Sequence, residues 1–333
     1  MPITSDAGAT RSISSVCTMG TPECDDELHL FLRCLRTFHT DIPVIVGCTS
    51  EMVGMGGQTV SKAFSQFRED RRIEWVPCLD QYLSINRSAM EKQRGVWYPS
   101  RHADFMMEKT NLMERAMLLR ERYSDDKNAA VAFFDCDVVL LGALPRLPAG
   151  TEVALSPHRI CRRDEALFGR YNGGFVVATN PLVLHEWRRA TQYSRFFDQA
   201  SLESVAGKFA STMYEFPPQH NYGYWRFFQS YREDPLLEAR QFSIAPMGAR
   251  RQWTLCYEGA PLGSIHTHFL LHAGQKQPQN IRAFNGLMKK LILKCIRPSP
   301  GRGAAAMCTA GLAAAENAGY RNCFDIAFLA SKP

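Results

Sequence analysis

The sequence predicts an α/β protein with a mostly parallel central sheet that is flanked by helices. Short apolar runs rich in β-branched residues alternate with segments of helical periodicity through the first half of the chain. Gly and Pro residues separate these segments, as expected between elements. Strands that alternate with helices form parallel sheets with right-handed crossovers. With 333 residues, the chain is long enough to bury a large core.

In the first half, residues 1–11 are expected to be disordered, and residues 80–104 to be irregular. The helices, each with one apolar face, are expected at Cys24–Phe38 and Phe105–Arg122. The strands are expected at Ser12–Met19, Pro43–Cys48, Ile73–Pro77 and Ala129–Leu141. The loop Gly54–Gly57 lacks the Lys and Ser/Thr of a phosphate-binding loop, so we expect a flexible connection.

The second half is expected to mix strands with irregular segments and to complete the same sheet. The expected elements are strands at Glu152–Leu155 and Tyr171–Thr179, a last apolar segment at Ser264–His272, and helices at Pro181–Tyr193, Phe196–Phe209 and Ile281–Ile296. We expect one domain over residues 12–296, with a nucleotide-binding half at 12–145 and an acceptor-binding, metal-completing half at 146–296. Residues 297–333, rich in Pro, Gly and Ala, are expected to form a peripheral tail.

Composition narrows the class of protein. The net charge of +6 suits an anionic substrate, and no run of Lys and Arg argues for nucleic acid. Eleven Cys without a Cys-x-x-Cys pair indicate a reducing compartment rather than a disulfide scaffold. No apolar run is long enough to span a membrane, and the first residues do not resemble a signal peptide. We therefore expect a cytoplasmic protein.

Two carboxylates, Asp135 and Asp137, interrupt the apolar run Ala129–Leu141. Asp is a poor strand former and is costly to bury without a partner. In open α/β sheets, ligands bind beyond the carboxyl ends of the strands. A divalent cation with oxygen ligands is the partner that such a pair favours.

Three further motifs follow in order along the chain. They are Tyr171-Asn172-Gly173-Gly174-Phe175, then Phe197-Asp198-Gln199, and then His266-Thr-His268-Phe-Leu-Leu-His272-Ala-Gly274-Gln-Lys276. The Asn-Gly-Gly turn has bare backbone that a ligand can approach closely. Taken with the Asp-x-Asp strand, this ordered set resembles the glycosyltransferases of the GT-A fold, especially the glycogenin-like and related nucleotide-diphospho-sugar transferases.

The resemblance implies a GT-A-like fold and transfer of a sugar from a nucleoside-diphosphate sugar, most simply a UDP-sugar. The acceptor would be a glycan, a protein or a small molecule. The leaving nucleoside diphosphate develops negative charge, which a cation must neutralise. In the resembling families, the Asp-x-Asp motif and a late His hold Mn²⁺ or Mg²⁺.

The resemblance also assigns roles to single residues. Asp137 and Asp135 would bind the metal, although Asp135 could instead contact the ribose. His268 is the preferred late His, because strand alternation points it the same way as His266, and His272 is the alternative. The remaining assignments are Lys276 at the diphosphate, Lys109 at the nucleotide, Asn172 and Gly173 at the donor sugar, and Asp198 as a sugar contact or a base. The family aromatic after Lys-Pro is absent, since this chain reads Lys276-Gln-Pro278.

Two other functions fit some of the same residues. An apolar strand followed by Asp-x-Asp also resembles the haloacid-dehalogenase-type phosphatases, with Asp135 as nucleophile and Asp137 as acid. About 130 residues precede the motif here, and no later acidic pair completes such a Mg²⁺ site. A sugar-nucleotide or glycan binder of the same fold without catalysis is the other alternative.

Overall fold

The computed structural model describes residues 10–55, 57, 60–83, 85–123, 130–229, 234–247, 252–270, 277–296 and 318–330. Its centre is a seven-stranded sheet in the order β10-β8-β9-β5-β2-β3-β4. The strands are β2 (Ile13–Met19), β3 (Val44–Cys48), β4 (Ile73–Pro77), β5 (Ala130–Phe134), β8 (Val153–Pro157), β9 (Tyr171–Ala178) and β10 (Met213–Glu215). In this sheet, β9 pairs antiparallel with both neighbours and the other pairings are parallel.

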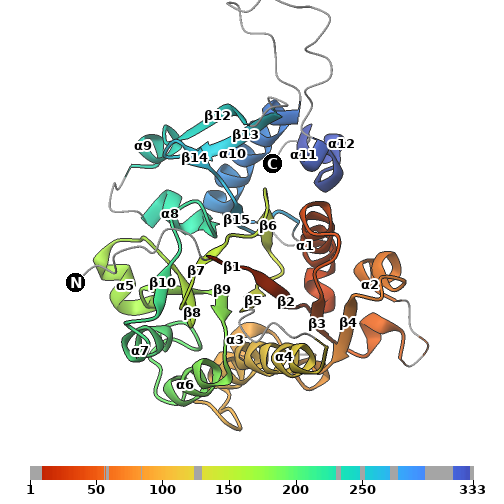
Figure 1. Ribbon diagram of the computed structural model, residues 1–333, viewed down its shortest axis with the longest axis vertical. Coiled ribbons are helices and arrows are strands. Elements are labelled where there is room, and N and C mark those ends of the chain that lie inside the picture. The colour runs from red at the N-terminus through yellow and green to blue at the C-terminus, as the bar shows by residue number, and fades with distance from the viewer. Residues whose placement is uncertain are drawn as a thin grey trace, which may run out of the picture.

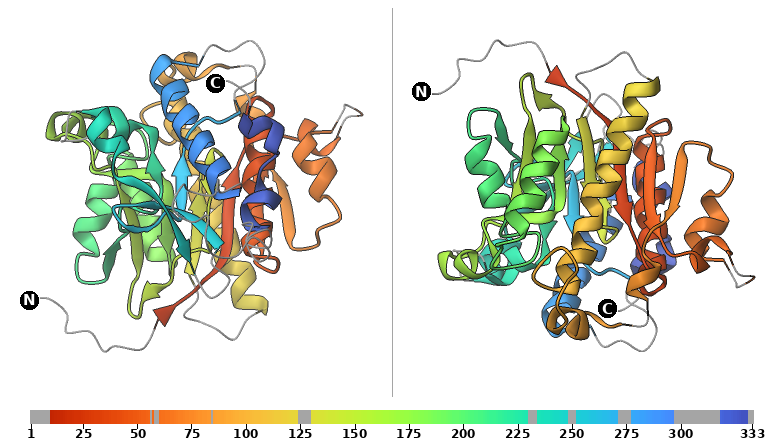
Figure 2. Two further views of the ribbon diagram at one scale, coloured as in Figure 1. Left: turned by 90° about the horizontal axis from the view of Figure 1, so that it is seen from above. Right: turned by 90° about the horizontal axis from the view of Figure 1, so that it is seen from below.

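Helices cover both faces of this sheet, which confirms the predicted α/β fold class. One face carries α4 (Arg101–Tyr123), α6 (Pro181–Thr191) and α7 (Leu202–Lys208), which lie in front of the sheet in the right view of Figure 2. The other carries α1 (Asp25–Phe38) and α10 (Gln279–Ile296) (Figure 1). Along β5, Val131 and Phe133 pack on the α4 side, and Ala132 and Phe134 on the α1 side.

Smaller sheets and short helices complete the second half. The small sheets are β11-β15-β6, β12-β13-β14 and β1-β7. Their strands are β1 (Thr10–Arg11), β6 (Val138–Leu140), β7 (Leu147–Pro148), β11 (Tyr222–Gly223), β12 (Phe242–Met247), β13 (Gln252–Tyr257), β14 (Ala260–Pro261) and β15 (Ser264–His266). The other helices are η1 (Pro22–Cys24), η2 (Glu51–Val53), α2 (Lys62–Phe67), η3 (Asp80–Tyr82), α3 (Arg87–Lys92), α5 (Arg162–Phe168), α8 (Tyr224–Gln229), α9 (Pro235–Ala239), α11 (Ala318–Cys323) and α12 (Ile326–Ala330).

The continuous strand expected over Ala129–Leu141 is wrong. The described part divides into β5 and β6, which belong to different sheets, with Asp135–Asp137 as the turn between them. Carboxylates that must meet a cation cannot also continue a buried ladder, so the chain leaves the central sheet here. The expected apolar segment Ser264–His272 is a strand only as far as His266, and residues 271–276 lie outside the described part.

Several expected boundaries also differ. Thr10–Arg11 form β1, so the disorder expected over residues 1–11 is wrong for these two. Residues 80–104, expected to be irregular, contain η3, α3 and the start of α4. The helix expected from Phe196 begins only at Leu202. The expected peripheral tail is wrong for residues 318–330, because α11 and α12 bury Tyr320, Cys323, Phe324 and Leu329.

No helix among the described residues is long and apolar enough to cross a membrane.

Phe175 tests the packing that holds β9 in the sheet. Its ring is fully buried and stacks between Phe134 and Phe216, with centroid distances of 4.2 Å to each. Replacing Phe175 by Ala should lower the free energy of unfolding by about 3–5 kcal/mol, because it removes this contact and leaves a cavity. Urea denaturation measures the loss. Leu182→Ala, at a position 65% exposed, should stay within about 0.5 kcal/mol of the wild type.

Candidate active site

The turn Asp135–Asp137 is fixed by hydrogen bonds to two distant segments. The Asp135 amide donates to Gly174 O on β9 at 3.0 Å, and the Thr267 amide donates to Asp137 O at 3.1 Å. Strand β15 pairs antiparallel with β6, which places His266 opposite Val138. The Asp-x-Asp motif therefore meets the start of the late histidine motif, although about 130 residues separate them.

Asp135, Asp137 and His266 form a group whose ligand atoms all lie within 4.8 Å of one another. His266 Nε2 lies 3.0 Å from Asp137 Oδ1 and 3.9 Å from Asp135 Oδ2. The other ring nitrogen, Nδ1, lies 3.0 Å from Asn221 Oδ1, and an Nδ1–H donated there leaves Nε2 free to bind a cation. Two carboxylates and an imidazole are a donor set that fits Mn²⁺ or Mg²⁺, with the imidazole favouring Mn²⁺.

His268 belongs to a second group, with Asp137 and Glu27 of α1, and these ligand atoms also lie within 4.8 Å of one another. His268 Nδ1 lies 3.2 Å from Asp137 Oδ2 and 3.5 Å from Glu27 Oε1. His266 and His268 therefore face different oxygens of the same carboxylate. The geometry makes His266, which the sequence analysis used only to orient His268, the histidine nearer to Asp135.

The two histidines set the electrostatics of Asp137. Burial alone would raise the pKa of Asp137, but the charges of His266 and His268 lower it overall. Burial outweighs the charges of Lys109 and His266 at Asp135, so the pKa of Asp135 is raised. At His268, Asp137 and Glu27 overcome the effect of burial and raise the pKa to about 9. At Asp137 and His268, the charge of each group thus favours the charged form of the other.

Lys109 lies beneath the site rather than in it. Its side chain is fully buried, and Nζ lies 2.8 Å from Asp198 Oδ2, 3.7 Å from Asp135 Oδ1 and 3.2 Å from Gly173 O. These two carboxylates overcome the effect of burial and raise the pKa of Lys109. Lys109 therefore joins the acidic turn to Asp198, which lies 89 residues after Lys109 in the chain. The expected contact between Lys109 and a nucleotide stays a prediction.

Asn172 is held by partners on three segments. Its Nδ2 donates to Gln199 Oε1 at 3.2 Å and lies 3.3 Å from His158 Nε2. Its Oδ1 accepts from the Gly174 amide at 2.9 Å and from Asn221 Nδ2 at 2.9 Å. Asn221 has a positive φ of 54°, a conformation in which Asn is enriched. Asn221 thereby positions both Asn172 and His266.

The two glycines after Asn172 leave room for the site's side chains. A Cβ on Gly173 would lie 2.5 Å from Asp198 Oδ2, and a Cβ on Gly174 would lie 2.4 Å from His266 Cε1. Only glycine permits β9 to pass this close to the carboxylates and the imidazole. Close packing against Asp198 and His266 is therefore enough to require both glycines, even if no ligand contacts them. The expected contact of Gly173 with a donor sugar stays a prediction.

The site opens into a cavity of about 350 Å³. Of the predicted site residues, Asp135, Asp137, Asn172, Asp198 and His268 line it. The other lining residues include aromatic and polar side chains: Arg87, His102, His158, Phe168, Phe196, Phe197, Gln199, Tyr224, Trp225 and His266. His272 and Lys276 lie outside the described residues. Most of the lining side chains are polar or charged, and they lie beside several aromatic rings, which suits a polar ligand with a ring or sugar face.

Four further residues of the site carry no role in the sequence motifs: His266, Glu27, Asn221 and His158. For His266 a signal existed, since it precedes His268 by two residues on an apolar segment. Glu27, Asn221 and His158 stand in no motif, and their roles depend on contacts between distant segments.

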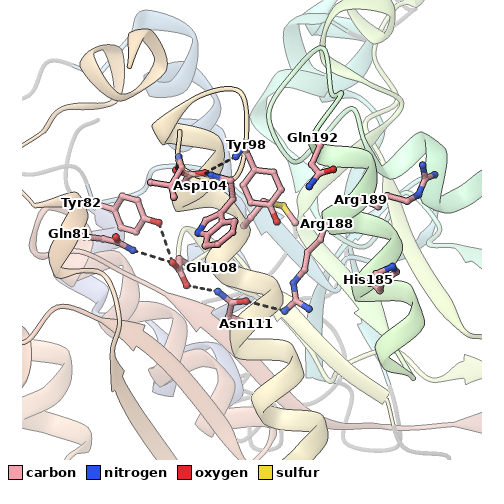
Figure 3. Close-up of a pocket in the computed structure, with 13 residues that line it drawn as sticks. Gln81, Tyr82, Tyr98, Asp104, Glu108, Asn111, His185, Arg188, Arg189 and Gln192 are labelled. Atoms are coloured by element: carbon pink, nitrogen blue, oxygen red, sulfur yellow. Dashed lines mark hydrogen bonds between the residues drawn. The ribbon is translucent and has the colours of Figure 1, made fainter. Parts of the chain in front are cut away.

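A second cavity, of about 630 Å³, lies between α4, α6 and the loop before α4 (Figure 3). In it, Gln81, Tyr82 and Asn111 donate hydrogen bonds to the Glu108 carboxylate. Asp104 accepts from the amides of residues 96–98 and so fixes a loop on which Trp97 is 77% exposed. Among the described residues, neither group able to hold a metal lies here, so the acid–histidine chemistry belongs to the smaller cavity.

No protein-family model matches the chain, and no curated protein matches its sequence. Solved structures similar to it include the bifunctional glycosyltransferase WbbM, with a TM-score of 0.39 and 10% identity over 65% of this chain and 40% of WbbM. The galactosyltransferase LgtC, solved with donor and acceptor sugar analogs, has a TM-score of 0.41 and 13% identity over 83% of this chain and 96% of LgtC. Mouse xyloside xylosyltransferase 1 has a TM-score of 0.39 and 9% identity over 76% of this chain and 96% of that protein.

The chain thus spans less than half of WbbM. TM-scores below 0.5 do not establish a common activity.

Replacing Lys109 by Met tests the buried ion pair. The change leaves Asp198, 3% exposed, without its cation, which should cost about 3–5 kcal/mol in the free energy of unfolding. Urea denaturation measures this cost. In the double variant Lys109→Met with Asp198→Asn, the loss should be smaller than the sum of the two single losses. Additive losses would contradict the pairing.

The pH dependence of stability tests the environment of His158. Burial lowers the pKa of His158 to about 4, whereas an unfolded histidine titrates near 6.5. Between these values the unfolded chain binds a proton that the folded protein does not, so stability falls as the pH decreases. From pH 7 to pH 4, the wild type should lose about 2–3 kcal/mol more than His158→Gln. Equal losses in urea titrations would contradict this environment, and exposed His185→Gln controls for removal of a histidine.

Proposed function

We propose that the protein is a metal-dependent glycosyltransferase that moves a sugar from a nucleoside-diphosphate sugar, most simply a UDP-sugar, to an acceptor. One observation supports this proposal above all. Asp135, Asp137 and His266 converge at a cavity that is also lined by Asn172 and Asp198. Four separate motifs of the sequence thus supply one site with a cation-binding end and a hydrogen-bonding end.

The cation-binding end suits the diphosphate. Asp135, Asp137 and His266 would hold a Mn²⁺ or Mg²⁺ ion, which stabilises the charge that develops on a departing diphosphate. Asn221 keeps the His266 ring in place through its contact with Nδ1. Arg87 lines the same cavity and adds a positive charge near it.

The hydrogen-bonding end suits the sugar. Asn172, Asp198 and Gln199 line the cavity with amide and carboxylate groups, which bind hydroxyls. Lys109 Nζ already contacts Asp198 Oδ2 at 2.8 Å, so one oxygen of this carboxylate is occupied by an ion pair. We therefore favour Asp198 as an acceptor of hydrogen bonds from the sugar over a role as a base. Phe196, Phe197 and Trp225 offer aromatic faces beside these groups.

The alternatives differ in what they release. A phosphatase with Asp135 as nucleophile would hydrolyse p-nitrophenyl phosphate, and a binder without catalysis would release no nucleoside diphosphate from a sugar nucleotide. The pairing of Asp135 with Lys109 and with a distant histidine favours metal binding over nucleophilic attack.

The ten described cysteines are free, which suits the cytoplasm.

Replacing Asp137 by Asn tests the function. Wild-type protein should release UDP from a UDP-sugar in Mn²⁺, and the variant should be slower by about 100-fold or more, because it loses a direct metal ligand. A coupled assay that detects UDP measures the rate of UDP release by both proteins. The donors tested are UDP-glucose, UDP-galactose and UDP-N-acetylglucosamine.

The control is Asp41→Asn, which removes a carboxylate that is 77% exposed and is not among the residues that line the cavity. It should keep wild-type turnover. Thermal shift adds a test of binding, since UDP with Mn²⁺ should stabilise the wild type and Asp41→Asn but not Asp137→Asn. Equal stabilisation of all three proteins would refute the metal assignment.

A further inference from the structure

Glu27 brings a third carboxylate to the candidate active site from the opposite end of the sequence. It lies in the first turn of α1 and is only 5% exposed. Its Oε1 faces Asp137 and His268, and the three ligand atoms lie within 4.8 Å of one another. The proposed ion at Asp135, Asp137 and His266 does not use Glu27 or His268.

Two atoms of this group are buried without a hydrogen bond. Glu27 Oε1 and His268 Nδ1 make no hydrogen bond of normal geometry and meet only as an ion pair at 3.5 Å, while His268 Nδ1 lies 3.2 Å from Asp137 Oδ2. A buried carboxylate oxygen and a buried ring nitrogen left this way are costly. Both atoms are good ligands for a divalent cation, and a cation between them and Asp137 would satisfy both.

Asp137 has the geometry of a bridging carboxylate. Its Oδ1 lies 3.0 Å from His266 Nε2, and its Oδ2 lies 3.2 Å from His268 Nδ1. Each oxygen therefore belongs to one of the two groups. Cations that share a carboxylate in this way stand about 3.5–4 Å apart in enzymes that act on phosphates.

The charges of the site leave room for a second cation. Lys109 balances Asp198, which leaves Asp135, Asp137 and Glu27 with three negative charges. A bound nucleoside diphosphate adds at least two more. One divalent cation with neutral histidines, together with Arg87 in the same cavity, offsets three of these five charges, and uncompensated buried charge is expensive.

We propose that Glu27, Asp137 and His268 hold a second divalent cation, bridged by Asp137 to the ion at Asp135 and His266. The inference rests on the proposed function only for that first ion. The second ion would face the diphosphate from the α1 side of the cavity, where His268 lines the wall.

Metal stoichiometry tests the second cation without turnover. Metal-free protein is titrated with Mn²⁺, and free Mn²⁺ is read from its electron paramagnetic resonance signal. We expect two Mn²⁺ per wild-type chain and a spin-coupled signal from the bridged pair. Glu27→Gln should bind one Mn²⁺ and lose the coupling. His268→Gln, at a side chain that is 40% exposed, should do the same with less risk to folding.

The matched control is Glu23→Gln, which removes an exposed carboxylate just before α1 and should keep two Mn²⁺. One Mn²⁺ in the wild type and still one in Glu27→Gln and His268→Gln would overturn the second cation and leave the proposed function intact. Two coupled Mn²⁺ in a protein that releases no UDP would support the second cation and count against the glycosyltransferase.

Discussion

The buried carboxylate of Asp137 is the constraint on which the site depends. A charge in this position must be balanced, and two histidines of one late segment provide the balance. That requirement fixes how the second half of the chain docks. It explains why β5 ends at Phe134, why β6 leaves the central sheet, and why β15 pairs with β6. Lys109 also balances negative charge at the site, through its ion pairs with Asp135 and Asp198.

The sequence predicted the elements whose pattern is local. The strands β2, β3, β4 and β9 and the helices α1, α6 and α10 were expected within a few residues of their observed bounds. Each has one continuous apolar face or run, and burial of that face determines its structure. The region 211–258 and the segment 318–330 could not be predicted, because their aromatic residues show no clear period and pack through tertiary contacts.

The site residues that stand in local sequence motifs were predictable, and those that depend on tertiary contacts were not. Asp135, Asp137, Asn172 and Asp198 stand in short motifs at strand ends or turns, and all four line one cavity. Glu27 belongs to the acidic first turn of α1, a common feature of helices that does not by itself indicate a metal ligand. Its approach to Asp137 depends on how α1 crosses the sheet, which no local pattern encodes. The choice between His266 and His268 likewise depended on the register of β15 against β6.

The pairing of β6 with β15 also sets an order of events during synthesis. The last strand of the central sheet, β10, ends at Glu215, whereas His266 emerges from the ribosome about 50 residues later. A nascent chain can therefore hold a nearly complete sheet whose acidic turn still awaits its histidines. Until they arrive, solvent and ions must screen Asp135 and Asp137. The sheet is thus a scaffold that matures before its active centre does.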